Sequence, residues 1–244
     1  MIGASPSTLP APSRLAAKTI SFTQPAVAGW VKEQVMAALL VIVPVFIQAP
    51  WVRQAPFGAA LFTVVLLSAG LVAANSANRN LQRSGELLVG FSGSWLAGAL
   101  FWGWASQHPI CHLPVEAFAL PLALAGLGSR WRLACGFYLG SLLGTAATDA
   151  AIAACHLMQF WPDVLLGDPQ QAEVLLRLAA QRLLQPGSIL ILCGFALALG
   201  LLSRWLWHRG EAARIAATAL GTTLVVDGLF VVAALAAPHL SGLI

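Results

Sequence analysis

Three carboxylates lie inside otherwise apolar stretches of this chain: Glu116, Asp149 and Asp227. Asp149 belongs to GFYLGSLLGTAATDAAIAACH, residues 136–156, which is long enough to cross a bilayer at ~1.5 Å of helix per residue. An acid is costly at membrane depth, and such residues often mark ion or proton paths. We therefore take the three acids as candidate proton or cation sites. The alternative is that each is protonated or hydrogen-bonded and fastens helices together.

Hydroxyl groups accompany both aspartates at helical spacing. Thr145 precedes Asp149 by one turn, and Thr223 precedes Asp227 by one turn. A hydroxyl at this position can hydrogen-bond the carboxyl group or help to bind a cation. We expect each threonine to support the aspartate that follows it.

Histidines accompany two of the acids. His112 precedes Glu116 by four residues, and His156 follows Asp149 by seven. On continuous helices each imidazole would lie on the same face as a carboxylate. This pattern predicts a polar funnel that attracts protons or cations.

Small residues occupy a second face of the stretch that carries Asp149. Gly136, Gly140 and Gly144 recur at every fourth position. Such a row predicts the close approach of another helix.

The dipeptide Cys-His occurs twice, at Cys111–His112 and at Cys155–His156. A two-cysteine, two-histidine metal site or a Cys111–Cys155 disulfide is conceivable if the two segments meet. However, adjacent helical residues point ~100° apart, so both members of a pair rarely face one partner. We favour interfacial histidines and core cysteines, and we expect neither a metal nor a cofactor.

The composition predicts an integral membrane protein. The 244 residues are 59% hydrophobic and 9% charged, whereas soluble domains average roughly 25% charged. The net charge of +4 is scattered over short loops, so we expect a lipid bilayer rather than a nucleic acid as partner. Residues 1–28, rich in proline and serine, predict a flexible tail without the apolar core of a secretory signal, and residues 29–244 predict one polytopic membrane domain.

We predict an all-α fold of about seven transmembrane helices. The expected spans are residues 34–51, 57–74, 87–105, 110–128, 133–156, 188–206 and 213–236. A proline inside the first span, Pro44, is expected to kink it. Residues 169–185 predict an interfacial amphipathic helix with Asp168 as its N-cap, Pro169 at its first position and Gln171 as a capping-box partner.

The basic residues predict the orientation. With a cytoplasmic N-terminus, seven alternating spans place ten of the 13 lysines and arginines on the cytoplasmic side, and only Arg53, Arg177 and Arg182 outside. This bias favours an N-terminus inside and a C-terminus outside. Most tryptophans lie near predicted span ends, with Trp95 and Trp102 as exceptions.

Two segments carry a family resemblance: VPVFIQAPWVRQAP at residues 43–56 and LGSLLGTAATD at residues 139–149. They resemble segments of a family of cyanobacterial multi-pass membrane proteins whose function is uncharacterised. The resemblance implies a cyanobacterial plasma or thylakoid membrane. It implies no activity and no functional residues.

The leading hypothesis is a small transporter or permease with proton or cation coupling at the intramembrane acids. The alternative is a non-catalytic scaffold or assembly factor that docks a larger membrane complex through glycine-rich faces and the amphipathic helix. A membrane-embedded enzyme ranks third, because HExxH, GxSxG, P-loop and GxGxxG motifs do not occur in a usable context. Since seven spans are few for a transporter, we expect a homo-oligomer or a partner subunit.

Overall fold

A computed structural model describes residues 26–236, so residues 1–25 of the predicted tail lie outside the described part. This part of the chain is helical and contains no β-strand. Its long helices are α1 (Ala26–Gln54), α2 (Pro56–Ala74), α3 (Arg79–Leu100), α6 (Arg132–Ala154), α9 (Pro186–Trp207) and α10 (Glu211–Ala236). Its shorter elements are the π-helix η1 (Phe101–Ala105), the 3₁₀ helices η2 (Pro109–Cys111) and η3 (Met158–Phe160), and α4 (His112–Glu116), α5 (Leu120–Gly126), α7 (Trp161–Leu166) and α8 (Pro169–Leu183).

Seven helical segments of the described chain are long and apolar enough to cross a membrane, which confirms the predicted fold class and number of spans. Six of these segments lie on the long helices, the third of them extending through η1 to Ala105. The fourth in sequence order, Pro109–Gly126, is composed of η2, α4 and α5. The first helix continues through Pro44 and Pro50 to Gln54, past its predicted end. These segments make the protein an integral membrane protein in composition and architecture.

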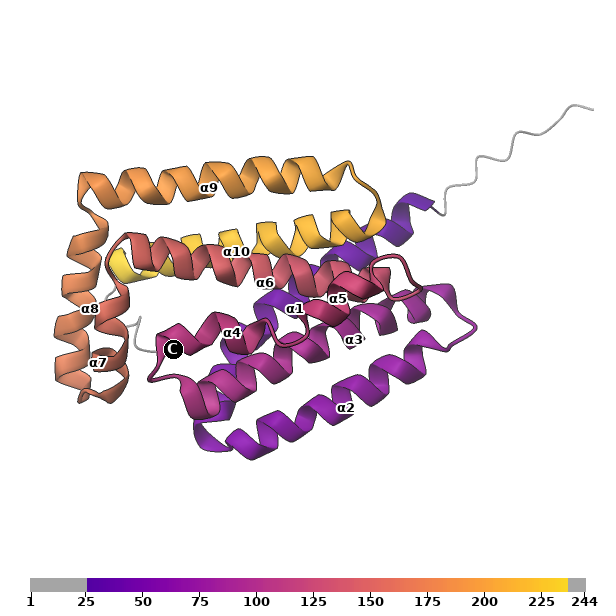
Figure 1. The fold of residues 1–244 in the computed structure, drawn as a ribbon, viewed down its shortest axis with the longest axis horizontal. Helices are drawn as coiled ribbons and strands as arrows, with labels where there is room; N and C mark the ends of the chain where they lie inside the picture. Colours follow the sequence, from indigo (N-terminus) through magenta and orange to yellow (C-terminus); the bar gives the residue numbers. More distant parts are fainter. Residues whose placement is uncertain (1–25, 237–244) are drawn as a thin grey trace, which may run out of the picture.

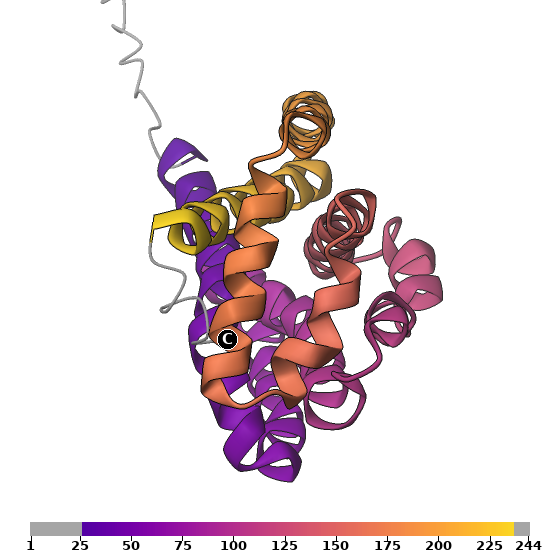
Figure 2. The same cartoon turned by 90° about the vertical axis from the view of Figure 1, so that its left-hand side faces the viewer.

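The long helices run side by side, and the chain passes back and forth between two ends of the bundle (Figure 1). Helices α7 and α8 instead stand across one end, nearly perpendicular to the rest, as Figure 2 shows from that side. The Asp168 carboxylate accepts a hydrogen bond from the Gln171 backbone N–H at 2.8 Å, as predicted for the N-cap of α8. This placement suits an amphipathic helix at a membrane surface.

The glycine row on α6 packs directly against α10. A methyl group added at Gly140 would lie 2.5 Å from the Ala216 carbonyl oxygen, and one at Gly144 would lie 2.7 Å from Thr223 Oγ1. Gly136 makes a similar approach to the backbone of Ala212. The predicted close contact of another helix is therefore confirmed, and that helix is α10.

An aromatic core joins the first three helices. Trp95, only 3% exposed, contacts Trp51 and Phe62 with ring centroids 5.8 and 5.4 Å apart. Its indole N–H donates to the Ala59 carbonyl at 2.8 Å, and its carbonyl accepts from the Gln48 amide at 2.5 Å. Trp95 is thus an interior residue, which explains why it falls outside the pattern of tryptophans at span ends.

An ion-pair network joins four helices at the end where α3, α6 and α10 begin. The Arg83 side chain of α3 pairs with Glu33 of α1 and, at 3.2 Å, with Glu211 of α10. Arg132 of α6 also reaches Glu211, at 2.8 Å. These contacts fasten the predicted cytoplasmic ends of the helices together.

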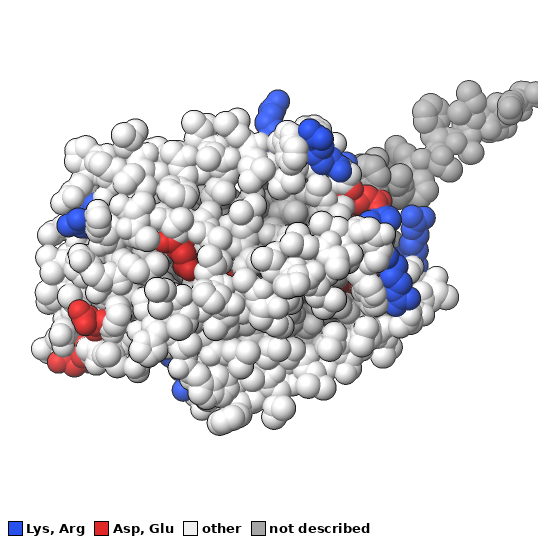
Figure 3. All heavy atoms as spheres, viewed as in Figure 1, with Lys and Arg blue, Asp and Glu red and all other residues white. Residues whose placement is uncertain are grey.

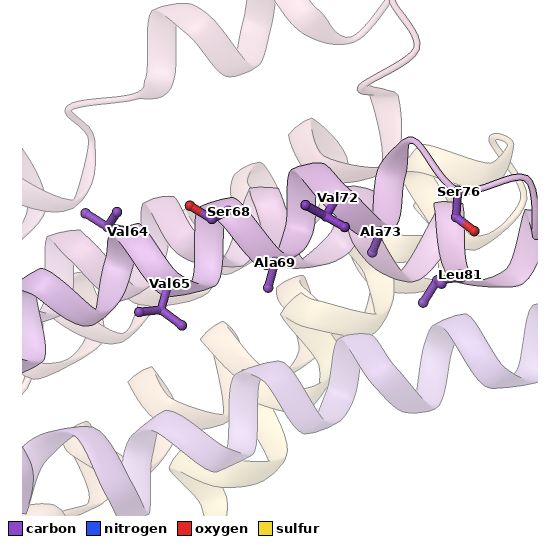
Figure 4. A pocket seen from close by; sticks show the side chains of 8 residues that line it. All are labelled: Val64, Val65, Ser68, Ala69, Val72, Ala73, Ser76 and Leu81. Carbon is purple, nitrogen blue, oxygen red and sulfur yellow. The ribbon is translucent and has the colours of Figure 1, made fainter.

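The sides of the bundle expose large apolar residues and little charge (Figure 3). One shallow apolar groove follows α2 and is lined by Val64, Val65, Ser68, Ala69, Val72, Ala73, Ser76 and Leu81 (Figure 4). Such a surface suits contact with lipid chains.

Replacing Gly140 by alanine should destabilise the protein, because the added methyl group would collide with the α10 backbone. Overpacking of this kind costs about 1–3 kcal/mol. Thermal unfolding in detergent, followed by circular dichroism, measures the change. Gly200→Ala in α9 is the matched control: nothing lies within 4 Å of its added methyl group, and it should not lower the unfolding temperature. Equal unfolding temperatures for Gly140→Ala and the wild type would contradict the close α6–α10 contact.

Candidate functional site

The fourth span is a broken helix. Its first part, α4, ends at Glu116, and α5 begins at Leu120 with Pro121 in its first turn. Proline removes a backbone donor and excludes the carbonyl four residues earlier, so the helix is interrupted ahead of it. The Leu120 N–H donates to the Ala117 carbonyl and the Phe118 N–H to the Val115 carbonyl, so the Glu116 carbonyl and the Ala119 N–H lose the partners that a regular helix would give them.

The Tyr138 hydroxyl on α6 satisfies two of these backbone groups. It donates to the Glu116 carbonyl and accepts from the Ala119 N–H at 3.1 Å. Tyr138 is the one tyrosine in the sequence and is 4% exposed. Tyr138 is absent from the residues predicted from the sequence, although a single tyrosine in an apolar span signals a hydroxyl that needs buried partners.

Beside this break, His112 lies between two carboxylates. Its Nδ1 atom lies 3.0 Å from both carboxylate oxygens of Asp149 on α6, and its Nε2 lies 3.4 Å from Glu116 Oε1. The three side chains are 11–18% exposed. The fold thus brings together three of the predicted site residues, from two antiparallel spans.

The two contacts of the imidazole ring require protons. A carboxylate only accepts hydrogen bonds, so both ring nitrogens must carry protons unless one of the acids is protonated. With two protons shared among the imidazole and the two carboxyl groups, the net charge of the three side chains is −1. A third proton makes the three side chains neutral, and a single proton leaves a net charge of −2. The arrangement can therefore take up and release a proton without a large rearrangement.

Aromatic rings enclose His112. Phe101, Trp161 and Trp102 have ring centroids 4.2, 5.9 and 6.3 Å from the imidazole. Phe101 and Trp102 begin the π-helix η1, and Trp161 donates its indole N–H to the Ser106 carbonyl at 2.9 Å. Local π-helices often occur at functional sites. Trp102, the second tryptophan outside the span-end pattern, is therefore part of the wall around His112.

A second intramembrane acid, Asp227 on α10, contacts Thr148 of α6. Thr148 Oγ1 lies 2.5 Å from Asp227 Oδ2 and also 3.1 Å from the Gly144 carbonyl oxygen. The threonine has a single hydroxyl proton and can donate it to only one of the two oxygens. Both contacts are hydrogen bonds at the same time if Thr148 donates to the Gly144 carbonyl and a protonated Asp227 donates to Thr148. Asp227 also lies within electrostatic range of Asp149.

Neither Thr145 nor Thr223 hydrogen-bonds the aspartate that it was predicted to support. Thr145 Oγ1 hydrogen-bonds the Ser141 carbonyl at 3.4 Å, and Thr223 Oγ1 hydrogen-bonds the Ala219 carbonyl at 3.1 Å. Hydroxyls in helices commonly bond the carbonyl four residues earlier, and this local bond competes with the expected one. The partner of Asp227 is instead Thr148, which lies across the α6–α10 interface.

His156 also departs from the prediction. Helix α6 ends at Ala154, and His156 is exposed with a φ of 56°, in the left-handed region that ends many helices. The helical spacing from Asp149 therefore does not extend to it. The Cys-His pairs likewise do not meet as a metal site, since the described residues contain no group of three or more metal-binding side chains, and all four cysteines are free thiols.

Comparison with known proteins gives one match. A family model described as "Protein of unknown function (DUF3120)" matches residues 37–235. Neither the curated proteins nor the solved structures contain a match to the chain.

Replacing Tyr138 by phenylalanine should destabilise the broken span, because the Glu116 carbonyl and the Ala119 N–H lose their shared partner. A buried group left without a partner costs about 1–3 kcal/mol. The free energy of unfolding in mixed micelles measures the loss. Thr63→Val is the control, since Thr63 Oγ1 is buried with no hydrogen-bond partner among the described residues and its removal should be neutral. Matching values for Tyr138→Phe and Thr63→Val would exclude the supporting role of Tyr138.

Proposed function

The chain belongs to the DUF3120 family of proteins of unknown function, and we propose that it is a small permease driven by protons. Protons bind at the group formed by His112, Asp149 and Glu116, which we call the carboxylate–histidine group. Asp227 with Thr148 is a second proton-binding position on the adjacent helix. The proposal names a reaction class, the coupled movement of a solute and a proton, and leaves the solute open.

The observation that carries this proposal is the buried imidazole between two carboxylates, beside a broken membrane helix. Broken helices at membrane depth are typical of transporter binding sites, because interrupted backbone can line a polar cavity. Ionisable groups are rare at such depth and are retained mainly for ion or proton movement. Both features occur here within one turn of helix.

The geometry favours a proton over a metal cation. The two ring nitrogens of His112 already lie against the oxygens that a metal would need. A proton uses these contacts as they stand, whereas a metal ion would have to displace the imidazole from both acids.

The orientation given by the basic residues completes the proposal. With the N-terminus cytoplasmic, the ion-pair network around Arg83 faces the cytoplasm. Asp149 then lies in the outer half of the membrane, about 8 Å from the outer end of α6. The site would be reached from the outer side of a cyanobacterial plasma or thylakoid membrane, with a second copy of the chain or a partner subunit alongside.

Replacing Asp149 by asparagine should abolish proton movement, because asparagine keeps the shape but cannot exchange a proton. The protein is reconstituted into liposomes that contain a pH-sensitive dye, candidate solutes are supplied outside, and a potassium diffusion potential drives protons inward. The wild type should acidify the interior, and Asp149→Asn should do so about tenfold more slowly or not at all.

Asp163→Asn is the control for this experiment, because Asp163 is an exposed acid on α7 and does not belong to the carboxylate–histidine group. Its proton movement should equal that of the wild type. Equal rates for Asp149→Asn and the wild type would reject the coupling role. The scaffold alternative would be favoured by two results together. The wild type would move no protons, and affinity purification would recover a partner complex with the wild type but not with Asp149→Asn.

A further inference from the structure

A polar cavity of about 210 Å³ opens at the predicted cytoplasmic end of the bundle. Its lining, which we call the arginine pocket, consists of Arg79, Gln82, Arg83, Glu86, Arg130, Arg132, Leu133 and Glu211. The residues come from the first two turns of α3, from the first turns of α6 and α10 and from the loop before α6. The pocket and helices α7 and α8 lie at opposite ends of the bundle. Most of the visible Lys and Arg atoms gather at the end that holds the pocket (Figure 3).

The charge around the pocket favours an anion. Four arginines and two glutamates give a formal excess of two positive charges, which becomes one when Glu33, the α1 partner of Arg83, is included. Helices α3, α6 and α10 also direct their N-termini, the positive ends of their dipoles, toward this end.

Two of the arginines are held at the rim of the pocket. Arg130 donates to Asn75 Oδ1 at 3.3 Å and lies over the Trp131 ring at 4.5 Å. The Arg132 side chain is 54% exposed while it pairs with Glu211. Both guanidinium groups thus keep donors that can turn toward a ligand.

The height of the pocket matches that of lipid headgroups. Tryptophans mark the membrane–water boundary, and Trp131, Trp205 and Trp207 lie at this end of the bundle, the latter two beside Arg209 and Arg214. Basic pockets between membrane helices on the cytoplasmic side commonly bind anionic headgroups. Arginine is well suited to this task because its planar fork matches two phosphate oxygens.

We propose that the arginine pocket binds a phosphate group, supplied by an anionic lipid of the cytoplasmic leaflet. A free phosphate has the same recognition chemistry and is the other source to be distinguished. Bound there, the phosphate joins the starts of α3, α6 and α10 next to the Arg83 network. The site is distinct from the carboxylate–histidine group and does not depend on proton movement.

Native mass spectrometry of the detergent-solubilised full chain tests the proposal. Phosphatidylglycerol should bind more tightly than phosphatidylcholine, which carries a phosphate without net charge. Arg79→Gln and Arg130→Gln should each weaken phosphatidylglycerol binding about fivefold, because each removes one positive charge near the headgroup. Arg177→Gln on α8, at the far end of the bundle, should leave binding unchanged.

A parallel arm adds inorganic phosphate and measures the unfolding temperature against chloride at equal ionic strength. An arginine-dependent rise with phosphate, without preferential binding of phosphatidylglycerol, would support the pocket and assign it to a free phosphate. Arg79→Lys keeps the charge and should retain most of the lipid binding, which separates loss of the site from loss of the fold. The proposal fails if both anions bind Arg79→Gln and Arg130→Gln as tightly as the wild type, or if neither anion binds better than its control.

Discussion

The close contact between α6 and α10 is the constraint on which the candidate site depends. Glycines at positions 136, 140 and 144 bring the two backbones together, with no space for even a methyl group. This contact fixes the rotation of α6 about its axis. One face of α6 is committed to α10, where Thr148 meets Asp227, and Asp149 is thereby turned toward α4. A larger residue in the glycine row would separate the helices and rotate the acid away from His112. The same small residues that stabilise the bundle therefore also position its chemistry.

The fourth span supplies the other half of the site. A continuous helix would bury its backbone polar groups in its own hydrogen bonds, whereas the break after Glu116 places a turn within the bundle. The Tyr138 hydroxyl stabilises this turn from α6, close to the point where Asp149 meets His112. Aromatic rings from η1 and α7 cover the imidazole and limit its contact with water. In such surroundings electrostatic interactions among the three side chains are stronger than in water, so a change in the charge of one side chain affects the other two.

Much of this architecture could be predicted from local patterns in the sequence. The seven spans, the glycine row and the Asp168 cap follow from hydropathy, spacing of small residues and capping chemistry, each of which acts over a few residues. The i, i+4 pair of His112 and Glu116 also follows from spacing, but its contact with Asp149 depends on how two spans align. Thr148 and Tyr138 were not found because their partners lie on other elements and no local period marks them. His156 was misplaced because helical spacing was extended past the end of α6, and the break in the fourth span decides contacts that a regular helix would not make.

In the proposed permease His112, Asp149 and Glu116 act as one proton-carrying unit. A double-mutant cycle on proton movement in liposomes tests it most directly, with His112→Gln, Asp149→Asn and the double variant compared at equal amounts of folded protein. Residues of one unit are non-additive, since removing either disables the whole. If the three side chains act as one unit, the double variant is no slower than the slower single variant. Losses that multiply, or a His112→Gln variant that moves protons like the wild type, would contradict it.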